Sequence, residues 1–115
     1  MTTTNTDPTI DPQQLRIAAE EAVAALKLLG NIERLLLLCQ LSQGEYSVGE
    51  LEEQLDIRQP TLSQQLAVLR SAGVVGTRRE GKNIYYCVAD PNVLDLLLVL
   101  YRLYCEKDKI PGSKP

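Results

Sequence analysis

Apolar residues recur at three- and four-residue spacing in the first third of the chain, the period of an α-helix with one buried side. Asp11–Pro12 is typical of an N-cap followed by a first helical residue, and Gly30–Asn31 interrupts the pattern, which predicts a helix between them. A second helix is predicted over Ile32–Leu41. Its residues 35–39 are all apolar, so this helix is expected to lie centrally, covered on most sides.

The middle of the chain predicts two helices separated by a tight turn. Ser47–Glu50 fits a capping box, which predicts a short helix ending at Leu55. Residues 56–59 then turn the chain, and Pro60 is expected to open a helix that ends at Ala72–Gly73, where glycine favours the left-handed stop.

The rest of the sequence predicts a hairpin and a last helix. Residues 74–79 and 84–88 have the composition of two strands, joined by the polar segment 80–83. Asp90–Pro91 caps a final helix that is expected to run to roughly Lys107.

The predicted order is α-α-α-α-β-β-α, a mainly α fold with a small β-hairpin, and the central part has the dimensions of a winged helix-turn-helix. A length of 115 residues is enough for one domain. We therefore expect a domain over residues 11–107 between flexible polar tails, 1–10 and 108–115. The apolar stripes on the first and last helices predict a partner surface, since so small a domain offers them little else to cover.

The net charge of −3 hides a strong asymmetry along the chain. Residues 1–57 carry three basic side chains against ten acidic ones, whereas residues 58–88 carry five basic side chains against Glu80 alone. One basic segment on an otherwise acidic protein favours a surface that faces phosphates.

The chain has no apolar run long enough for a membrane span and no basic-then-apolar N-terminal segment. Together with only three cysteines, this predicts a cytoplasmic protein with no membrane association, whose thiols are free, metal-binding or reactive and not a disulfide scaffold.

The helix predicted over 60–72 has the pattern of a DNA-reading helix. Leu62, Leu66 and Leu69 share one side and should face the core. The opposite side is small and polar, and segment 59–73 contains no acidic residue, so it can approach base edges and phosphates. The candidate reading residues are Gln59, Thr61, Ser63, Gln64 and Ala67.

A basic hairpin directly after a helix-turn-helix is typical of a wing that reaches toward the DNA backbone or minor groove. The candidate wing contacts are Arg78, Arg79, Lys82, Asn83 and Tyr85.

Several of these segments resemble the arsenical-resistance-repressor (ArsR) family of winged helix-turn-helix proteins, in particular its sulfide-responsive branch. The likeness covers residues 23–105 and is carried by Ser47-Val-Gly-Glu-Leu51, the segment from Gln59 to Arg70, Gly73-Val-Val75, Arg78–Arg79 and Ile84-Tyr-Tyr86. The resemblance implies a homodimer, built on the first and last helices, that represses transcription from a palindromic double-stranded operator.

Cys39 and Cys105 match the cysteine pair of that branch. The resemblance implies that reactive sulfur species or oxidants convert this pair into a disulfide or polysulfide bridge and so weaken operator binding. Bridging needs the two Cα atoms to come within about 7 Å, a reach that extra sulfur atoms extend. Cys87 lies outside the pair and is interpreted as structural.

A metal- or ligand-gated repressor of the same family is an alternative, although the chain has no histidine and no paired cysteines for a metal site. A winged-helix module that binds only proteins is a second alternative, and the basic hairpin beside an acid-free helix disfavours it. No Cys-x-x-Cys, histidine base or glycine-rich phosphate loop is present, so we expect neither an enzyme nor a cofactor.

Overall fold

The computed structural model describes residues 10–106. The predicted tails 1–10 and 108–115, apart from Ile10, and the predicted helix end at Lys107 lie outside that range. The described elements are, in order, α1 (Pro12–Leu29), α2 (Ile32–Leu41), β1 (Tyr46–Ser47), α3 (Val48–Leu55), α4 (Thr61–Ser71), β2 (Val75–Glu80), β3 (Asn83–Val88), α5 (Pro91–Leu100) and a π-helical turn η1 (Tyr101–Cys105).

Side-chain caps start the helices where the sequence predicts them. Asp11 accepts the backbone N–H of Gln13 at 3.3 Å at the start of α1, and Asp90 accepts the N–H of Asn92 at 2.9 Å at the start of α5. The capping box of α3 forms in both directions, with the Ser47 N–H donating to Glu50 at 2.9 Å and the Glu50 N–H donating to Ser47 at 3.3 Å. These bonds satisfy amides that the first helical turn leaves without partners.

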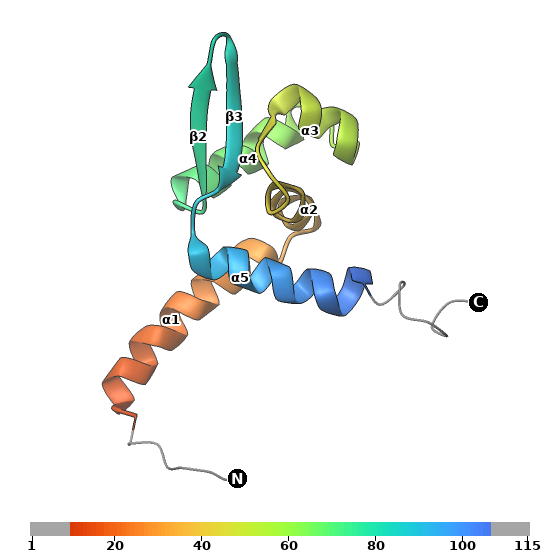
Figure 1. Cartoon of the computed structure of the whole chain (residues 1–115). Coiled ribbons are helices and arrows are strands. Elements are labelled where there is room, and N and C mark those ends of the chain that lie inside the picture. The colour runs from red at the N-terminus through yellow and green to blue at the C-terminus, as the bar shows by residue number, and fades with distance from the viewer. Residues whose placement is uncertain (1–9, 107–115) are drawn as a thin grey trace, which may run out of the picture.

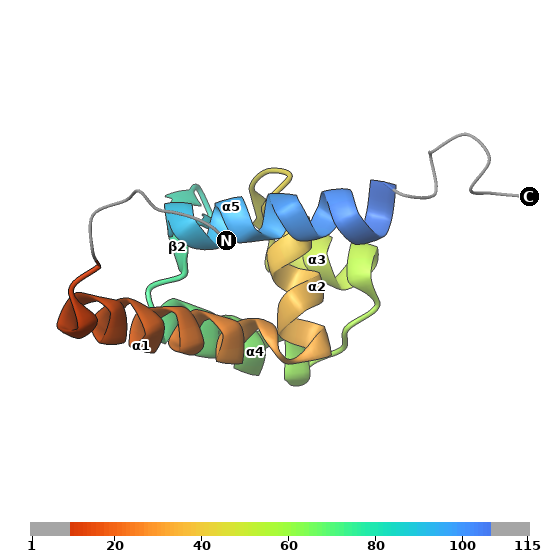
Figure 2. The same ribbon diagram turned by 90° about the horizontal axis from the view of Figure 1, so that it is seen from below.

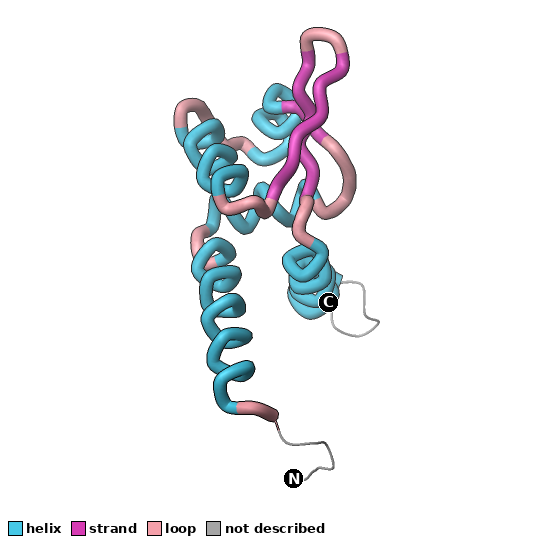
Figure 3. Tube along the Cα trace, turned by 90° about the vertical axis from the view of Figure 1, so that its left-hand side faces the viewer, coloured by secondary structure: helices cyan, strands magenta, loops and turns pink. Residues whose placement is uncertain are grey.

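The core lies between α2, the α3–α4 pair and the base of the sheet. Its fully buried leucines include Leu37 and Leu38 of α2, and Leu97 of α5 packs into it from the side of the last helix. The hairpin of β2 and β3 projects from one end of the molecule, while α1 and α5 lie on the other side of α2 (Figure 1). Figure 3 shows the same separation from the side, with the hairpin and the free end of α1 pointing in opposite directions.

Three details differ from the sequence predictions. The hairpin is part of a three-stranded antiparallel sheet of order β1-β3-β2, because Tyr46 and Ser47 pair with Tyr86 and Tyr85. The helix predicted to open at Pro60 starts one residue later, and Pro60 is its N-cap. The last α-helix ends at Leu100, where the chain continues as the wider π turn.

Helix α2 is central and covered on most sides, as predicted, since Ile32 and Leu36 are its two exposed residues. Leu37, Leu38 and Leu41 are buried, whereas Leu36 is 42% and Ile32 75% exposed. Seen from below, α2 crosses between α1 and α5, and these two helices form the near surface of the molecule (Figure 2).

Among residues 10–106, no helix has the length and apolar character that crossing a bilayer requires.

Candidate nucleic-acid interface and thiol groove

Helix α4 exposes the polar side that the sequence pattern indicates. Leu62, Leu66 and Leu69 are buried, while Ser63 and Gln64 are exposed. Ala67 is also exposed, and Thr61 is half-buried at the first turn. A helix so arranged offers small and hydrogen-bonding side chains to a groove while its leucines anchor it to the core.

Gln59 acts as a cap of α4. Its Oε1 accepts the backbone N–H of Ser63 at 3.1 Å, in the place that the side chain of Pro60 cannot fill. The oxygen of the Gln59 side-chain amide is therefore already hydrogen-bonded within the protein. Its Nε2 group has no partner within the described part of the chain and remains available as a donor.

The two sides of the wing differ because side chains alternate along its strands. Arg79 pairs across the hairpin with Ile84, and Thr77 pairs with Tyr86, whose ring packs against the core beside α4. Arg78 pairs with Tyr85 and therefore lies on the side turned away from α4. The sequence predicted both arginines as DNA contacts, but their side chains lie on opposite sides of the sheet.

The charge of Arg78 is already compensated within the protein. Its Nη2 and Nε donate to the Glu45 carboxylate at 2.8 and 3.0 Å, and its Nη1 donates to Glu80 at 2.9 Å. The guanidinium also lies 5.1 Å from the centre of the Tyr85 ring, a cation–π distance. The Arg78 hydrogen bond, more than its charge, holds the pKa of Glu45 below its ordinary value.

Within residues 10–106, Arg79 and Lys82 of the wing form no ion pair, and both are exposed, as is Asn83. These two residues are therefore the uncompensated cations of the hairpin. Sequence reasoning counted Arg78 with them because its partner Glu45 lies 33 residues away and enters only when β1 joins the sheet.

Cys39 and Cys105 line one groove. The groove has a volume of about 440 Å³ and lies between α2 and the last helical segment, which is α5 continued by η1. Its other lining side chains are Ile32, Leu35, Leu36, Leu100, Tyr101 and Tyr104. Cys39 is half-buried and Cys105 is exposed. Burial raises the pKa of the Cys39 thiol above its ordinary value, and the nearby Cys105 raises it further.

The third thiol is elsewhere. Cys87 is half-buried in β3 opposite Gly76, on the side of the sheet that carries Tyr85, and it does not line this groove. The structure thus places in one groove the two cysteines that the family resemblance paired, Cys39 and Cys105, and places Cys87 outside it. All three are free thiols.

Arg34 connects α2 with two other helices, a contact that the sequence analysis missed. Its Nε and Nη2 donate to the carbonyls of Leu28 at 2.8 Å and Lys27 at 3.2 Å, and its Nη1 donates to Gln65 Oε1 at 3.1 Å. The end of α1 and the inner flank of α4 are therefore held to the helix that carries Cys39. Arg34 is the one basic residue of the largely apolar helix α2, which is the sequence signal that could have identified it.

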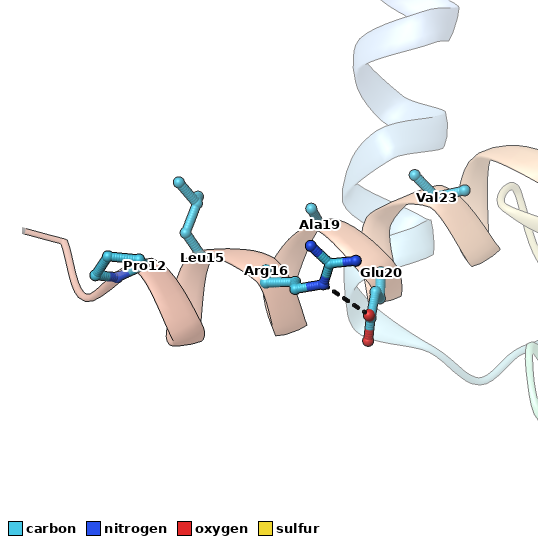
Figure 4. A pocket seen from close by; sticks show the side chains of 6 residues that line it. All are labelled: Pro12, Leu15, Arg16, Ala19, Glu20 and Val23. Carbon is cyan, nitrogen blue, oxygen red and sulfur yellow. Dashed lines mark ion pairs between the residues drawn. The ribbon is translucent and has the colours of Figure 1, made fainter.

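The helices farthest from the wing leave large apolar side chains on the surface. Leu29 is the buried residue of α1, whereas Leu15, Val23 and Leu26 are about half exposed. Figure 4 shows the shallow hollow along this helix, where Leu15 and Val23 flank Ala19 beside the ion pair of Arg16 and Glu20. Three apolar side chains of the last helical segment, Leu98, Leu103 and Tyr104, are similarly exposed.

Comparison with known proteins gives consistent matches over most of the chain. The model of "Bacterial regulatory protein, arsR family" matches residues 33–77. The Biofilm growth-associated repressor of Agrobacterium fabrum (strain C58 / ATCC 33970) is 54% identical over 91 residues, which are 79% of this chain and 78% of that protein. The transcriptional activator HlyU of Vibrio cholerae serotype O1 is 39% identical over 97 residues, 84% of this chain and 90% of that protein.

Among solved structures, the crystal structure of the transcriptional repressor BigR from Xylella fastidiosa is similar, with a TM-score of 0.76 and 45% identity. That match covers 84% of this chain and 98% of the BigR chain. The resemblance inferred from the motifs and the predicted winged-helix fold are both confirmed by these matches.

Proposed function

This chain belongs to the bacterial arsR family of regulatory proteins, and from that premise we propose that it is a repressor released from its operator when Cys39 and Cys105 are oxidised. Like its relatives, it is a DNA-binding transcriptional regulator and not an enzyme. Because its target is DNA, we expect it to act in the cytoplasm.

The apolar groove shared by the two thiols is the observation that carries the sensing proposal. Cys105 is exposed, so a small sulfur species meets it first, while Cys39 is half-buried and its pKa is raised by that burial and by Cys105, so its thiolate is the rarer nucleophile and reacts second. The pair therefore has an accessible thiol and a sheltered thiol that can resolve the first adduct.

The proposed chemistry needs one persulfide, R–S–SH, as the oxidant. The Cys105 thiolate attacks the terminal sulfur, which gives a Cys105 persulfide and releases the thiol R–SH. The Cys39 thiolate then attacks the Cys105 sulfur and forms a disulfide, and hydrogen sulfide leaves. If both cysteines first become persulfides, the same attack forms a trisulfide and also releases hydrogen sulfide, which extends the reach of the bridge.

Bridging would act on DNA binding through α2. Cys39 lies on the same helix as Arg34, which hydrogen-bonds Gln65 of α4 and the last turn of α1. A link that pulls α2 toward the end of the chain would change how α4 is held. The bridged and reduced proteins would then differ in operator affinity, which is the requirement for a switch.

We propose that a second copy of this chain covers the exposed apolar side chains of α1 and of the last helical segment. The exposed residues include Leu26 and Leu103, and burying them would remove a large apolar surface from water. A twofold dimer would present two α4 helices to successive major grooves of a palindromic operator.

In this proposal the exposed side of α4 reads the bases and the wing contacts the backbone. Gln64 and Ser63 lie at the centre of the exposed side, flanked by Gln59, Thr61 and Ala67. Arg79, Lys82 and Asn83 are the direct wing contacts. Arg78 and Tyr85 instead hold the wing in place, because the Arg78 guanidinium is bound to two carboxylates and lies over the tyrosine ring.

Single cysteine variants test the sensing proposal. A duplex selected by the reduced wild-type protein from a random-sequence pool serves as the operator, and fluorescence anisotropy follows its release after an organic persulfide is added. Wild type and Cys87→Ser should release the duplex. Cys39→Ser and Cys105→Ser should bind it as tightly as wild type and retain it. Release by Cys105→Ser to the wild-type extent would place the sensor elsewhere.

A further inference from the structure

A pocket with three hydroxyls and a guanidinium among its lining groups lies in the corner between α4 and the wing, separate from the thiol groove. Its volume is about 460 Å³, and its walls come from one flank of α4 and from β3; they are Ser63, Leu66, Ala67, Arg70, Ser71 and Tyr86. Ser63 and Ala67 also belong to the exposed side of α4, so the pocket adjoins the surface that we propose to face DNA.

The lining groups favour an anion. Ser63, Ser71 and Tyr86 each bring a hydroxyl donor, Arg70 brings a guanidinium, and no carboxylate lines the pocket. In the described part of the chain, Arg70 forms no ion pair and no side-chain hydrogen bond, and it is exposed. Arg70 thus differs from Arg78, whose charge is compensated by Glu45 and Glu80.

The pocket lies at the C-terminal end of α4, where the helix dipole disfavours an anion. Two of the carbonyls there are already bonded, because the N–H of Ala72 donates to Val68 O at 3.1 Å and that of Gly73 donates to Arg70 O at 3.0 Å. The attraction for an anion must therefore come from the Arg70 side chain, which makes this residue the test of the site.

The location decides which anion fits. Tyr86 pairs with Thr77 across the hairpin, and Arg79 lies two residues farther along the same side of β2. When α4 lies in a major groove, the corner between the reading helix and the wing is next to the groove edge, where the sugar–phosphate backbone runs. The pocket and Arg79 would then follow one strand.

We propose that this pocket seats one backbone phosphate of the bound duplex, held by Arg70 and by the hydroxyls of Ser63, Ser71 and Tyr86. The proposal rests on the DNA-binding function proposed above. It assigns Arg70 to affinity and to the register of α4 in the groove, not to the choice of bases, because a phosphate carries no sequence information.

A chemical scan of the duplex tests the pocket directly. Each backbone linkage of the selected duplex is replaced in turn by a neutral methylphosphonate, and affinity is measured for wild type and for Arg70→Gln. Wild type should lose affinity at each linkage whose phosphate it contacts, including one per half-site that the pocket seats. Arg70→Gln should bind the unmodified duplex about tenfold more weakly than wild type, with a salt slope lower by about two because the dimer loses one phosphate contact in each half-site, and it should lose sensitivity only at the linkage that the pocket seats.

Two further variants separate contact from folding. Tyr86→Phe keeps the packed ring and should reduce the sensitivity at the same linkage by a smaller amount. Arg102→Gln removes an exposed arginine of the last turn, away from the pocket, and should reproduce the wild-type profile. If Arg70→Gln keeps every sensitive linkage of wild type, the phosphate site is refuted while DNA binding stands. If wild type itself shows no salt-dependent duplex binding, the proposed function fails.

Discussion

The half of the molecule around α4 and the half formed by α1 and the last helical segment place their apolar residues very differently. Leu62 and Leu69 of α4 are 0% exposed, and the outward side of that helix is mostly polar, with Val68 its one large apolar side chain. Leu26 of α1 is 56% exposed and Tyr104 is 65% exposed. The first half has a complete core within one chain, whereas the second leaves its apolar side uncovered.

This difference separates two tasks. A finished core holds α4 and the wing rigidly, as a surface that reads DNA requires. An unfinished apolar side is where a second copy can bind, and the groove with Cys39 and Cys105 lies at its border. Arg34 is the polar contact that joins the two halves, because it bonds both the end of α1 and Gln65 of α4.

The largest expected effect comes from a charge placed on the uncovered side. Leu26→Glu should convert the proposed dimer to a monomer and lower operator affinity by about 100-fold or more, because an unpaired charge in an apolar interface costs several kcal/mol. Sedimentation velocity and anisotropy measure the two consequences.

Ile17→Glu is the matched control for that substitution. Ile17 is 53% exposed on the same helix, but it projects from the side opposite Leu26, so this variant should remain a dimer. Dissociation of both variants, or of neither, would contradict the proposed interface.

A smaller effect should distinguish the two contacts of the reading half. Gln64→Ala should relax base preference at one position of the duplex, at a cost of about 1–3 kcal/mol for the preferred base. Arg79→Ala should weaken binding to all sequences alike, by about tenfold, and lower the salt slope by about two, because the dimer loses one phosphate contact in each half-site. The opposite pattern in a selection experiment would mean that the roles of helix and wing are exchanged.

The smallest effect concerns the side of the wing turned away from α4. Glu45→Gln removes the main partner of Arg78 and should weaken binding about two- to threefold through the wing's position, without changing the salt slope. A steeper slope would mean that the freed Arg78 contacts phosphates directly.

Acid should reproduce this effect in the wild-type protein. The pKa of Glu45 is lowered by the hydrogen bond from Arg78, so the ion pair is intact at neutral pH and is lost only as the pH falls through that lowered value. Amide exchange of the hairpin, measured against pH, should show the wing loosening below the ordinary titration range of glutamate.

Local signals predicted most of the fold. Asp11, Asn31, Ser47 and Asp90 cap helices at their first turns, and each cap acts within three residues of its position. The strand β1 escaped prediction because two residues carry no period, and its pairing partner lies some forty positions away in β3. The π turn at Tyr101 has no recognised sequence pattern either.

The candidate site divides in the same way. The polar side of α4 follows from helical spacing, so its exposed residues were predicted correctly as a surface. The pairing of Arg78 with Glu45 depends on strand order, and the bonds of Arg34 depend on how three helices cross, so neither follows from local sequence. The prediction that Cys39 and Cys105 form a pair rested on the family resemblance and not on spacing, and the structure places both in one groove.

The central claim, that two thiols in one groove control a DNA-reading surface, is tested most directly by one paired measurement. Reduced protein bound to the selected duplex is titrated with persulfide, and each sample is divided between intact-mass spectrometry and anisotropy. The fraction of chains carrying a Cys39–Cys105 bridge, seen as loss of two hydrogens or as the net sulfur gain of a trisulfide, should equal the fraction of duplex released. Complete bridging with the duplex still bound, or complete release from unbridged chains, would contradict the account.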